Sequence, residues 1–520
     1  MDYGFLALLP PIVAIILAFL TKDVVISLTA GIFLGTTVVY GWNPFLGIIK
    51  SVSDYIVPSM ASEWNAAILF QAALFGILIT FLQNNGGAVA LGYSMTKKMK
   101  TKKSTQVAAW CFGILIFFSD YFNTLMVGGL FRPITDEKRI SREKLAYISD
   151  STASAVCLLV PFSAWLAYVM GLIGNSYMEL GITESPYVAY LKTIPYNSYA
   201  ILVVVMVLAI AITGKDFGPM LKAERRADKG DVLRPGSKPL SSKELTDAKF
   251  EARTTDLSSF WLPIVVMMGS ILPILLWDGG YPEKDFVDAI GSASGAVCLA
   301  WSVLLGVIVV VVQSLVKKTF TFSEAMELIM DGVKGMSMTY VILILAWSIG
   351  SLTKGMGAAE YLVPIIKGNI PVMFLPALVF ITGALISFST GTSYGTFAIL
   401  VPIAIPLAAK LGAPMYPMIA AAFSGGLFGD HCSPISDTTV MSSTGAACDH
   451  IDHVKTQLPY ALLCAAVATV GFIVSAAIGS GIITNIIVIA LLIIALFVMN
   501  KATDKEEVKS KAKVVKNSIN

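Results

Sequence analysis

The chain has 520 residues, of which 56% are hydrophobic and only 14% charged, and its mean hydropathy is +0.76. Soluble proteins carry roughly 25% charged residues, so the composition excludes a soluble globular protein and predicts an all-α polytopic membrane protein. The net charge of +3 does not indicate a nucleic-acid partner, because the basic residues gather in loops and in the tail, as membrane topology requires. The six cysteines have no paired spacing, so no disulfide framework is implied.

Apolar runs of the length that crosses a bilayer, about 20 residues, are the main feature of the chain. They predict eleven crossings, over residues 4–20, 24–40, 66–82, 145–173, 199–213, 260–277, 289–312, 337–352, 417–444, 458–478 and 482–499. The first run follows Asp2 and lacks a basic n-region, so we interpret it as a span rather than as a cleaved signal. Two further apolar regions, 104–131 and 372–411, are too interrupted by polar residues to be simple spans.

The distribution of basic residues orients these spans, because lysine and arginine favour cytoplasmic loops. Basic segments at 97–103, 215–256, 317–318 and 501–520 are therefore expected in the cytoplasm, and the acidic segments 175–198 and 278–288 outside. The loops fall on the expected sides only if both interrupted regions are re-entrant hairpins, which return to the side of the membrane that they entered from. This assignment predicts an outside N-terminus and a cytoplasmic C-terminus. It also predicts an N-terminal half (1–214), a solvated cytoplasmic charged linker (215–256), a C-terminal half (257–500) and a cytoplasmic Lys-rich tail (501–520).

The two halves share a weak internal repeat. The offset that aligns Tyr121 with Tyr394 also aligns Pro161 with Pro434 and Ser163 with Ser436. Each half contains an interrupted hairpin (104–131 or 372–411) followed by a long span broken at proline (145–173 or 417–444). The loop charges open the two hairpins to opposite sides, which predicts an inverted-topology repeat around a site near the middle of the membrane.

The polar residues within these apolar segments are the candidate site. The main cluster is the break Gly429-Asp430-His431-Cys432-Ser433-Pro434, where proline opposes a continuous helix and a buried carboxylate marks an ion pathway. A small hard cation needs several oxygen ligands, which the break and both hairpin tips supply. We predict sodium at Asp430, Asp120 and Asn123. The candidate ion- or substrate-binding residues are Ser119, Asp120, Asn123, Thr392, Ser393, Thr396, Asp430, Ser433, Asp437 and Thr438.

Two other uses of these polar residues stay open at this point. Helix N-termini at the breaks would suit an anionic substrate group instead of a cation, and the residues alone do not distinguish the two. Serine and threonine hydroxyls in membrane helices also bond the backbone groups that a kink releases.

The three histidines of the chain, at positions 431, 450 and 453, all lie in this region. We interpret Asp430 as a carrier that alternates between proton and cation, with His431 as a tuner or second titrating group. The segment 448–453 has ligand types for a transition metal but no second cysteine pair, so a helix cap or a pH-responsive surface is favoured there. Asp150 lies near the start of the first broken span, and its sequence position is equally compatible with a role at the entry of a helix and with contact to an ion.

The run from Gly429 to Thr439, GDHCSPISDTT, resembles the signature of the NhaC-type sodium/proton antiporter family, and so do Ser442-Ser443-Thr444-Gly445, His450 to Val454 and Gln457 to Tyr460. That family is similar in turn to the wider ion-transporter superfamily, whose members have two inverted hairpins. The resemblance implies secondary active transport, with sodium efflux against proton entry and no cofactor beyond the transported ions. It also implies a bacterial inner membrane and, by analogy, a homodimer. The superfamily's Ser-Asn-Thr hairpin motif is not cleanly present, because three residues separate Ser119 from Asn123 and the second hairpin has Thr392-Ser393.

Two alternatives from other classes accompany this interpretation. The first is a sodium- or proton-coupled carrier or exchanger of a small organic solute, such as an amino acid, malate or lactate, which the many hydroxyl donors would suit. The second is an intramembrane enzyme using His431, Cys432 and Ser433, which is disfavoured because adjacent residues rarely reach the geometry of a base and a nucleophile. An ATP-driven pump is disfavoured because no GxxxxGK[ST] loop occurs.

Overall fold

The computed structural model describes residues 3–21, 23–87, 90, 99–117, 119–161, 163, 165–239, 256–286, 289, 293–358, 361, 370–434 and 436–499. Every regular element in these ranges is a helix, so the prediction of an all-α membrane protein is confirmed at that level. The predicted tail 501–520 and residues 240–255 of the predicted linker lie outside the described residues.

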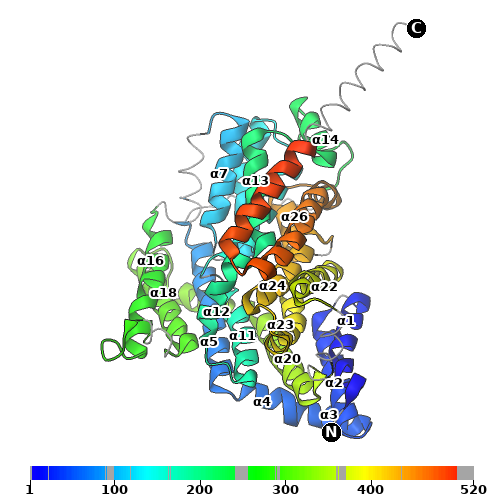
Figure 1. The fold of residues 1–520 in the computed structure, drawn as a ribbon. Helices are drawn as coiled ribbons and strands as arrows, with labels where there is room; N and C mark the ends of the chain where they lie inside the picture. The colour runs from blue at the N-terminus through cyan, green and yellow to red at the C-terminus, as the bar shows by residue number, and fades with distance from the viewer. Residues whose placement is uncertain are drawn as a thin grey trace, which may run out of the picture.

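The helices of the N-terminal half do not form a single bundle, because the first two lie at one side of the molecule against helices of the second half (Figure 1). In chain order they are η1 (Gly4–Leu8), α1 (Leu9–Thr21), α2 (Val24–Val39), α3 (Pro44–Lys50), η2 (Ser51–Ile56), α4 (Val57–Met60), α5 (Glu63–Asn84), α7 (Lys102–Leu115), α8 (Asp120–Glu137), α9 (Arg142–Ser151), α10 (Ser154–Leu159), α11 (Leu166–Leu180), α12 (Pro186–Thr193), η3 (Ile194–Tyr196) and α13 (Ser198–Thr213).

The second half adds a two-helix edge and the broken helices of the centre. After α14 (Gly218–Asp228) of the linker, its elements are α16 (Ser258–Asp278), α18 (Gly295–Val316), α19 (Phe322–Gly335), α20 (Ser337–Gly355), η4 (Val372–Phe374), α22 (Leu375–Thr390), α23 (Ser393–Leu411), α24 (Met415–Cys432), α25 (Asp437–Gly445), α26 (His450–Ile478) and a last helix, Gly481–Met499. Helices α16 and α18 pack together at one edge beside α5, away from α24 (Figure 1).

Seven helices in the described ranges are long and apolar enough to cross a membrane, or eight if the bent pair 25–39 and 44–60 counts as one span. One of the seven is Ser393–Leu411, which we predict to be an arm of a re-entrant hairpin. Several predicted spans, such as 145–173, are instead divided into shorter helices. The helices therefore establish a multi-pass protein, and the number of eleven crossings stays a prediction.

Both interrupted regions are helical hairpins in the structure. The first is α7 and α8, which meet at residues 116–119, and the second is α22 and α23, which meet at Gly391 and Thr392. Gly391 has φ +71°, a left-handed conformation that ends α22 without the steric cost a Cβ would bring. Each hairpin thus places the first residue of its second helix, Asp120 or Ser393, at its tip.

The break predicted at Gly429 begins at Ser433, four residues later than expected. Helix α24 continues through Asp430, His431 and Cys432, and the chain becomes extended at Ser433, with φ −74° and ψ 136°. The ring of Pro434 disfavours a helical conformation of the residue before it, so Ser433 is where the helix must end. Asp430 and His431 consequently lie in the last helical turn and not in a loop.

Element boundaries recur with the offset of the internal repeat. The offset that aligns Tyr121 with Tyr394 also pairs the start of α8 with that of α23, the start of α9 with that of α24, and the end of α10 with that of α24. Val160-Pro161 and Ser433-Pro434 are the corresponding chain breaks. The recurrence extends the repeat from residue types to helix ends, and the opposite orientation of its two copies stays a prediction.

Helices α8 and α25, from opposite halves of the chain, approach each other closely at two glycines. A Cβ on Gly128 would lie 2.4 Å from the carbonyl carbon of Gly445, and one on Gly445 would lie 2.7 Å from the carbonyl oxygen of Thr124. Backbone therefore rests on backbone, which any larger side chain would prevent.

The described part of the linker does not behave as a solvated segment, which corrects our expectation. Helix α14 packs on α9 and α26 and buries Met220, Ala223 and Ala227, which lie on one helical face. We call residues 215–239 the strap. Several of its charged side chains pair with partners across the contact, among them Asp216 with the buried Lys144 of α9.

Candidate functional site

The carboxylate of Asp430 is buried in the centre of the molecule, where its residue is only 3% exposed. Oδ2 accepts a hydrogen bond from the Ser393 hydroxyl at 2.7 Å, and Oδ1 accepts one from Ser436 at 2.7 Å and a longer one from Thr438 at 3.5 Å. These three partners are neutral, so they orient the carboxylate without offsetting its charge. The structure thus brings together three of the predicted site residues, Asp430, Ser393 and Thr438.

The three described hydroxyl partners of the Asp430 carboxylate lie at the beginnings of helices. Ser393 is the first residue of α23, Ser436 caps α25 through the amide of Thr439, and Thr438 lies in the first turn of α25. Helix N-termini carry partial positive charge, which stabilises an anion placed against them. The two N-termini therefore face a carboxylate that belongs to the protein itself.

Other predicted residues at this cluster bond the backbone. The Ser433 hydroxyl donates to the carbonyl of Phe388 at 2.7 Å, and Thr396 donates to the carbonyl of Thr392 at 3.0 Å. Both bonds satisfy carbonyls near the hairpin tip, which is the role hydroxyls commonly take at interrupted membrane helices. Asp437 begins α25, and its side chain lies outside what the structure describes.

Asp120 forms a second cluster at the tip of the first hairpin. Its Oδ2 accepts hydrogen bonds from the indole nitrogen of Trp165 at 3.0 Å and from Ser154 at 3.4 Å, and its Oδ1 accepts one from the Tyr121 amide at 3.0 Å. Ser119 is buried next to it. The described hydrogen bonds therefore divide the predicted sodium ligands between two clusters, with Asp430 in one and Asp120 in the other.

Asn123, one turn after Asp120, links the two helices of the first hairpin through its amide nitrogen, while its amide oxygen has no described partner. Its amide nitrogen donates to the carbonyls of Gly113, Ile116 and Thr152, at 2.5, 3.4 and 3.1 Å. Its Oδ1 is buried and has no hydrogen-bond partner in the described structure. An amide oxygen in this condition is available to a cation.

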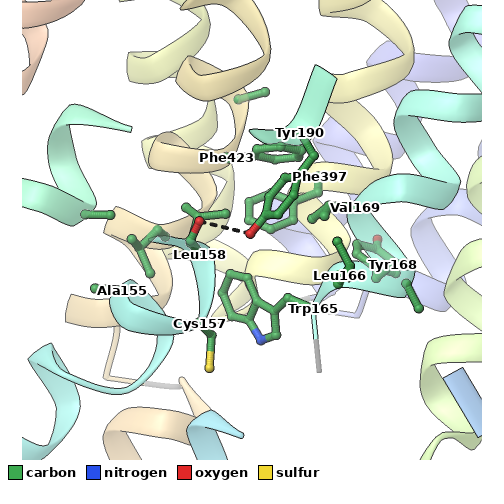
Figure 2. Close-up of a cluster of buried hydrophobic side chains, with 14 of the residues drawn as sticks. Ala155, Cys157, Leu158, Trp165, Leu166, Tyr168, Val169, Tyr190, Phe397 and Phe423 are labelled. Atoms are coloured by element: carbon green, nitrogen blue, oxygen red, sulfur yellow. Dashed lines mark hydrogen bonds between the residues drawn. The ribbon is translucent and has the colours of Figure 1, made fainter. Parts of the chain in front are cut away.

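Trp165 joins the two hairpin tips. While its indole nitrogen bonds Asp120, its ring packs edge-on against Tyr394 and Phe397 of α23, with centroids 5.5 and 5.6 Å apart. Figure 2 shows the indole beneath Phe397, with its nitrogen turned away from Phe397 and Phe423. Tyr168 extends this contact by donating a hydrogen bond to the carbonyl of Tyr394. Our sequence reasoning missed Trp165, because a tryptophan in an apolar run carries no signal beyond burial.

His431 does not contact the carboxylate of its neighbour Asp430 in any described hydrogen bond. Its Nε2 lies 2.8 Å from the Ser151 hydroxyl and its Nδ1 lies 2.9 Å from the Tyr199 hydroxyl. A hydroxyl can donate or accept, so this environment accommodates either tautomer. The imidazole and the carboxylate point in different directions because adjacent helical residues are rotated by about 100°. The role of His431 as a tuner or second titrating group stays a prediction.

A third buried carboxylate, Asp150, lies near the end of α9. Its Oδ2 accepts hydrogen bonds from Gln457 at 2.7 Å, Thr439 at 3.1 Å and His453 Nε2 at 3.3 Å. Sequence reasoning left Asp150 undecided and missed the other three as site residues. The available signal was helical spacing, since His453 and Gln457 are four residues apart and share a face of α26.

The segment 448–453 partly matches its prediction. Asp449 caps α26 by accepting from the amides of Ile451 and Asp452, which confirms the predicted helix cap. The predicted surface is wrong for His453, whose side chain is fully buried against Asp150. Within the described ranges, no group of three or more histidine, cysteine or acidic side chains is placed to hold a metal ion.

The side chains proposed for the enzyme alternative have separate partners. His431 faces Ser151 and Tyr199, the Cys432 thiol donates to the carbonyl of Phe428, and the Ser433 hydroxyl donates to the carbonyl of Phe388. A nucleophile needs its base within hydrogen-bond reach. In the described contacts the three side chains bond other groups at the end of α24 and do not bond one another.

Comparison with known proteins extends these observations. The family model described as Na+/H+ antiporter family matches residues 156–477. An uncharacterized protein of Haemophilus influenzae is 34% identical over 509 residues, which cover 95% of both chains. The Malate-2H(+)/Na(+)-lactate antiporter of Bacillus subtilis is 38% identical over 88 residues, 17% of this chain and 19% of the relative.

Among solved structures, the YdaH transporter of Alcanivorax borkumensis aligns with a TM-score of 0.57 over 84% of this chain and 90% of that one, at 12% sequence identity. At this identity the likeness concerns the fold alone. The family match spans more than half of the chain and includes α10 to α26, with the Asp430 cluster and most of the groups around Asp150. The chain is therefore a member of the Na+/H+ antiporter family, a multi-pass membrane transporter.

Proposed function

We propose that the protein exports sodium in exchange for protons, with the Asp430 carboxylate as the central ligand of the transported cation. The observation that carries the proposal is the setting of this buried carboxylate, which is oriented by three hydroxyls at the N-termini of α23 and α25. A carboxylate in such a setting can bind a metal cation, and a proton bound at or near it opposes that binding, so proton and cation compete.

The hydroxyls around Asp430 would also serve the cation. Ser393, Ser436 and Thr438 now donate their hydrogens to the carboxylate, and each keeps lone pairs that can coordinate sodium. A hard cation prefers such oxygen ligands. Carbonyls near the chain break at Ser433, and the side chains of Thr396 and Asp437, are the further candidates on this side.

The first hairpin supplies the other proposed ligands. Asp120 is a second buried carboxylate with neutral partners, and Asn123 offers a buried amide oxygen without a described partner. Because hydrogen bonds place Asp120 and Asp430 in separate clusters, we propose one cation position at each hairpin tip in place of a single shared site. Ser119 and Thr392 border these positions.

Within its family we propose that the chain is of the NhaC type, on the motif from Gly429 to Thr439. We further propose a bacterial inner membrane with the N-terminus outside and the C-terminus in the cytoplasm, because the basic loops favour that orientation. A homodimer, by analogy with the wider superfamily, and an inverted repeat, from the sequence offset and the loop charges, complete the proposal.

The direct test uses the purified protein in liposomes that contain a pH-sensitive dye. Sodium added outside should move protons across the membrane without any organic solute. Asp430→Asn should abolish this response, while Asp256→Asn, at an exposed acid outside the site, should leave it unchanged. A wild-type protein that inserts correctly and moves no protons with sodium would contradict the proposal.

A second candidate function is exchange or cotransport of a small organic acid. It is favoured by the partial similarity to a malate/lactate antiporter and by the hydroxyl-rich break. In the same liposomes, proton movement that begins only when malate, lactate or an amino acid is added would favour this function. Saturable uptake of the labelled solute, driven by a sodium gradient, would then establish it.

A further inference from the structure

The contact between α9 and α26 contains a buried polar group that the proposed sodium ligands do not include. Asp150 from α9 meets Thr439 from α25 and His453 and Gln457 from α26, and all three donate toward the same oxygen, Oδ2. Asp150, His453 and Gln457 are all buried. We call these four residues the Asp150 cluster.

The hydrogen positions in this cluster follow from its partners. A carboxylate only accepts, so His453 Nε2 must carry a hydrogen. The Ser442 hydroxyl, 3.2 Å from the same nitrogen, donates to the carbonyl of Thr439 and can therefore also accept from His453. The second ring nitrogen, Nδ1, is the atom at which His453 can gain a proton.

Two buried atoms of the cluster have no hydrogen-bond partner among the described residues. They are His453 Nδ1 and Gln457 Oε1, which lie one helical turn apart on the same face of α26. Buried polar groups without partners are rare and require an explanation. A neutral imidazole with hydrogen on Nε2 presents a lone pair at Nδ1, so both unpartnered atoms are acceptors that a bound proton or its water would satisfy.

Other ionisable groups surround the cluster from each packed helix. His431 and Cys432 approach from α24, with His431 in electrostatic range of both Asp150 and His453, and Tyr199 approaches from α13. At the start of α26, Asp452 is paired with Arg234 of the strap. No ion pair with lysine or arginine is described for Asp150, so His453 is the cationic partner that the described contacts offer it.

We propose that Asp150 and His453 form the proton-binding site of the exchange, distinct from the cation position at Asp430. A proton from the aqueous phase adds to His453 Nδ1, and the resulting imidazolium neutralises Asp150 through its Nε2 hydrogen bond. The inference rests on the proposed sodium/proton exchange, and it assigns the proton to a different place.

Thr439 couples this site to the cation position. Its single hydroxyl hydrogen faces both Asp150 Oδ2, at 3.1 Å, and the backbone carbonyl of Asp430, at 3.2 Å. Charge on Asp150 attracts the hydrogen, and neutralisation of Asp150 releases it toward Asp430. Gln457 adds a second link, since its amide nitrogen donates both to Asp150 and to the carbonyl of His431. Proton binding therefore changes the last turn of α24, where Asp430 lies.

The experiment separates proton coupling from sodium transport in the full-length protein in liposomes. His453→Gln keeps an amide donor toward Asp150 and removes the titrating group. It should reduce sodium-driven proton movement at least tenfold, while exchange of labelled for unlabelled sodium stays within threefold of wild type. Asp430→Asn should lose both activities. His450→Gln, the matched loss of an imidazole outside the Asp150 cluster, should keep the wild-type pH profile.

The outcomes divide clearly. If wild type exchanges sodium for protons and His453→Gln does so equally well with an unchanged pH profile, the proton site is elsewhere and this inference is overturned. If wild type shows no sodium-driven proton movement at all, the proposed function itself fails.

A measurement on the wild-type protein covers the case in which the variant does not fold. Only three histidines occur in the chain, so nitrogen NMR of histidine-labelled protein gives three rings to follow. We expect Nδ1 of the buried His453 ring to gain a proton as pH falls through the range in which the protein exchanges ions. Added sodium should shift that protonation to lower pH. A His453 ring that keeps one protonation state throughout would overturn the inference.

Discussion

Three acids at the strap contact and the three acids of the centre have different kinds of partner. At the strap, Asp216 pairs with Lys144, Glu143 with Arg226 and Asp452 with Arg234. At the centre, the described partners of Asp120 and Asp430 are hydroxyls, an indole and a backbone amide, and those of Asp150 are a hydroxyl, an amide and an imidazole.

The difference separates acids that hold the fold from acids that can change charge. A carboxylate beside lysine or arginine keeps its charge, because the ion pair strongly favours the ionised form. A carboxylate among neutral donors is oriented and keeps the capacity to bind a proton or a cation. Burial alone would not have distinguished the two groups, since Asp216 and Asp430 are both nearly inaccessible, with residue exposures of 7% and 3%.

The largest expected effect is on stability at the strap. Lys144→Met leaves Asp216 buried without its cation, and breaking a buried pair in this way costs about 3–5 kcal/mol of unfolding free energy. Denaturant unfolding in mixed micelles measures it. The double variant Lys144→Met with Asp216→Leu should recover most of the loss, and a single variant as stable as wild type would contradict the comparison.

The central acid should show the opposite pattern. Asp430→Asn keeps the shape of the side chain, so the unfolding free energy should stay within about 1 kcal/mol of wild type while exchange falls at least about a hundredfold. Denaturant unfolding in mixed micelles measures the stability of the variant, and the liposome assay measures its exchange. A variant that is strongly destabilised would place Asp430 among the structural acids.

Trp165→Phe tests the link between the hairpin tips with a smaller effect. The change keeps the ring that packs on Phe397 and removes the hydrogen bond to Asp120. A hydrogen bond to a charged group contributes about 1.5–3 kcal/mol, so the sodium concentration at half-saturation should rise at least about tenfold. Trp261→Phe, in α16 at the edge of the molecule, is the matched control and should leave half-saturation unchanged.

The smallest effect is expected at Asp256, an exposed acid before α16. Its hydrogen bonds to Lys317 and Ser258 lower its pKa to about 2, and the ordinary value is 3.8. Its contribution to stability is therefore complete above pH 3.8 and is lost only as pH falls through about 2. Asp256→Asn should change the melting temperature by a small amount that is the same at every pH from 5 to 9, and it should leave exchange unchanged. A change that varies with pH within that range would contradict this assignment.

Much of the architecture could be predicted from composition and proline positions. The apolar runs anticipated α2, α5, α13, α16 and α26, and Pro434 marked a helix end to within a few residues. These features are local, because hydropathy and the missing amide hydrogen of proline act on the segment that contains them. The packed strap could not be foreseen, since its burial depends on Lys144 and Glu143 from a distant helix.

The candidate site was predictable in part for the same reason. Asp430, Ser393 and Asp120 were identified because a charge or a hydroxyl at a helix break carries a local signal. Asp150 and His453 were not, because they are about 300 residues apart in the chain and become partners only when α26 packs on α9. A side chain whose role depends on its partner cannot be recognised until the partner is known.

The contact of Gly128 with Gly445 has a consequence for leakage. Because no side chain separates their backbones at this contact, α8 and α25 are in direct contact there, and a shift of one helix displaces the other. The first residue of α8 is Asp120, and the first turn of α25 holds Asp430 through Thr438. The two carboxylates are thus carried on one mechanical unit. Under the proposed alternating access they would reach each side of the membrane together, and a sodium ion would then lack a half-open state through which it could cross without coupling.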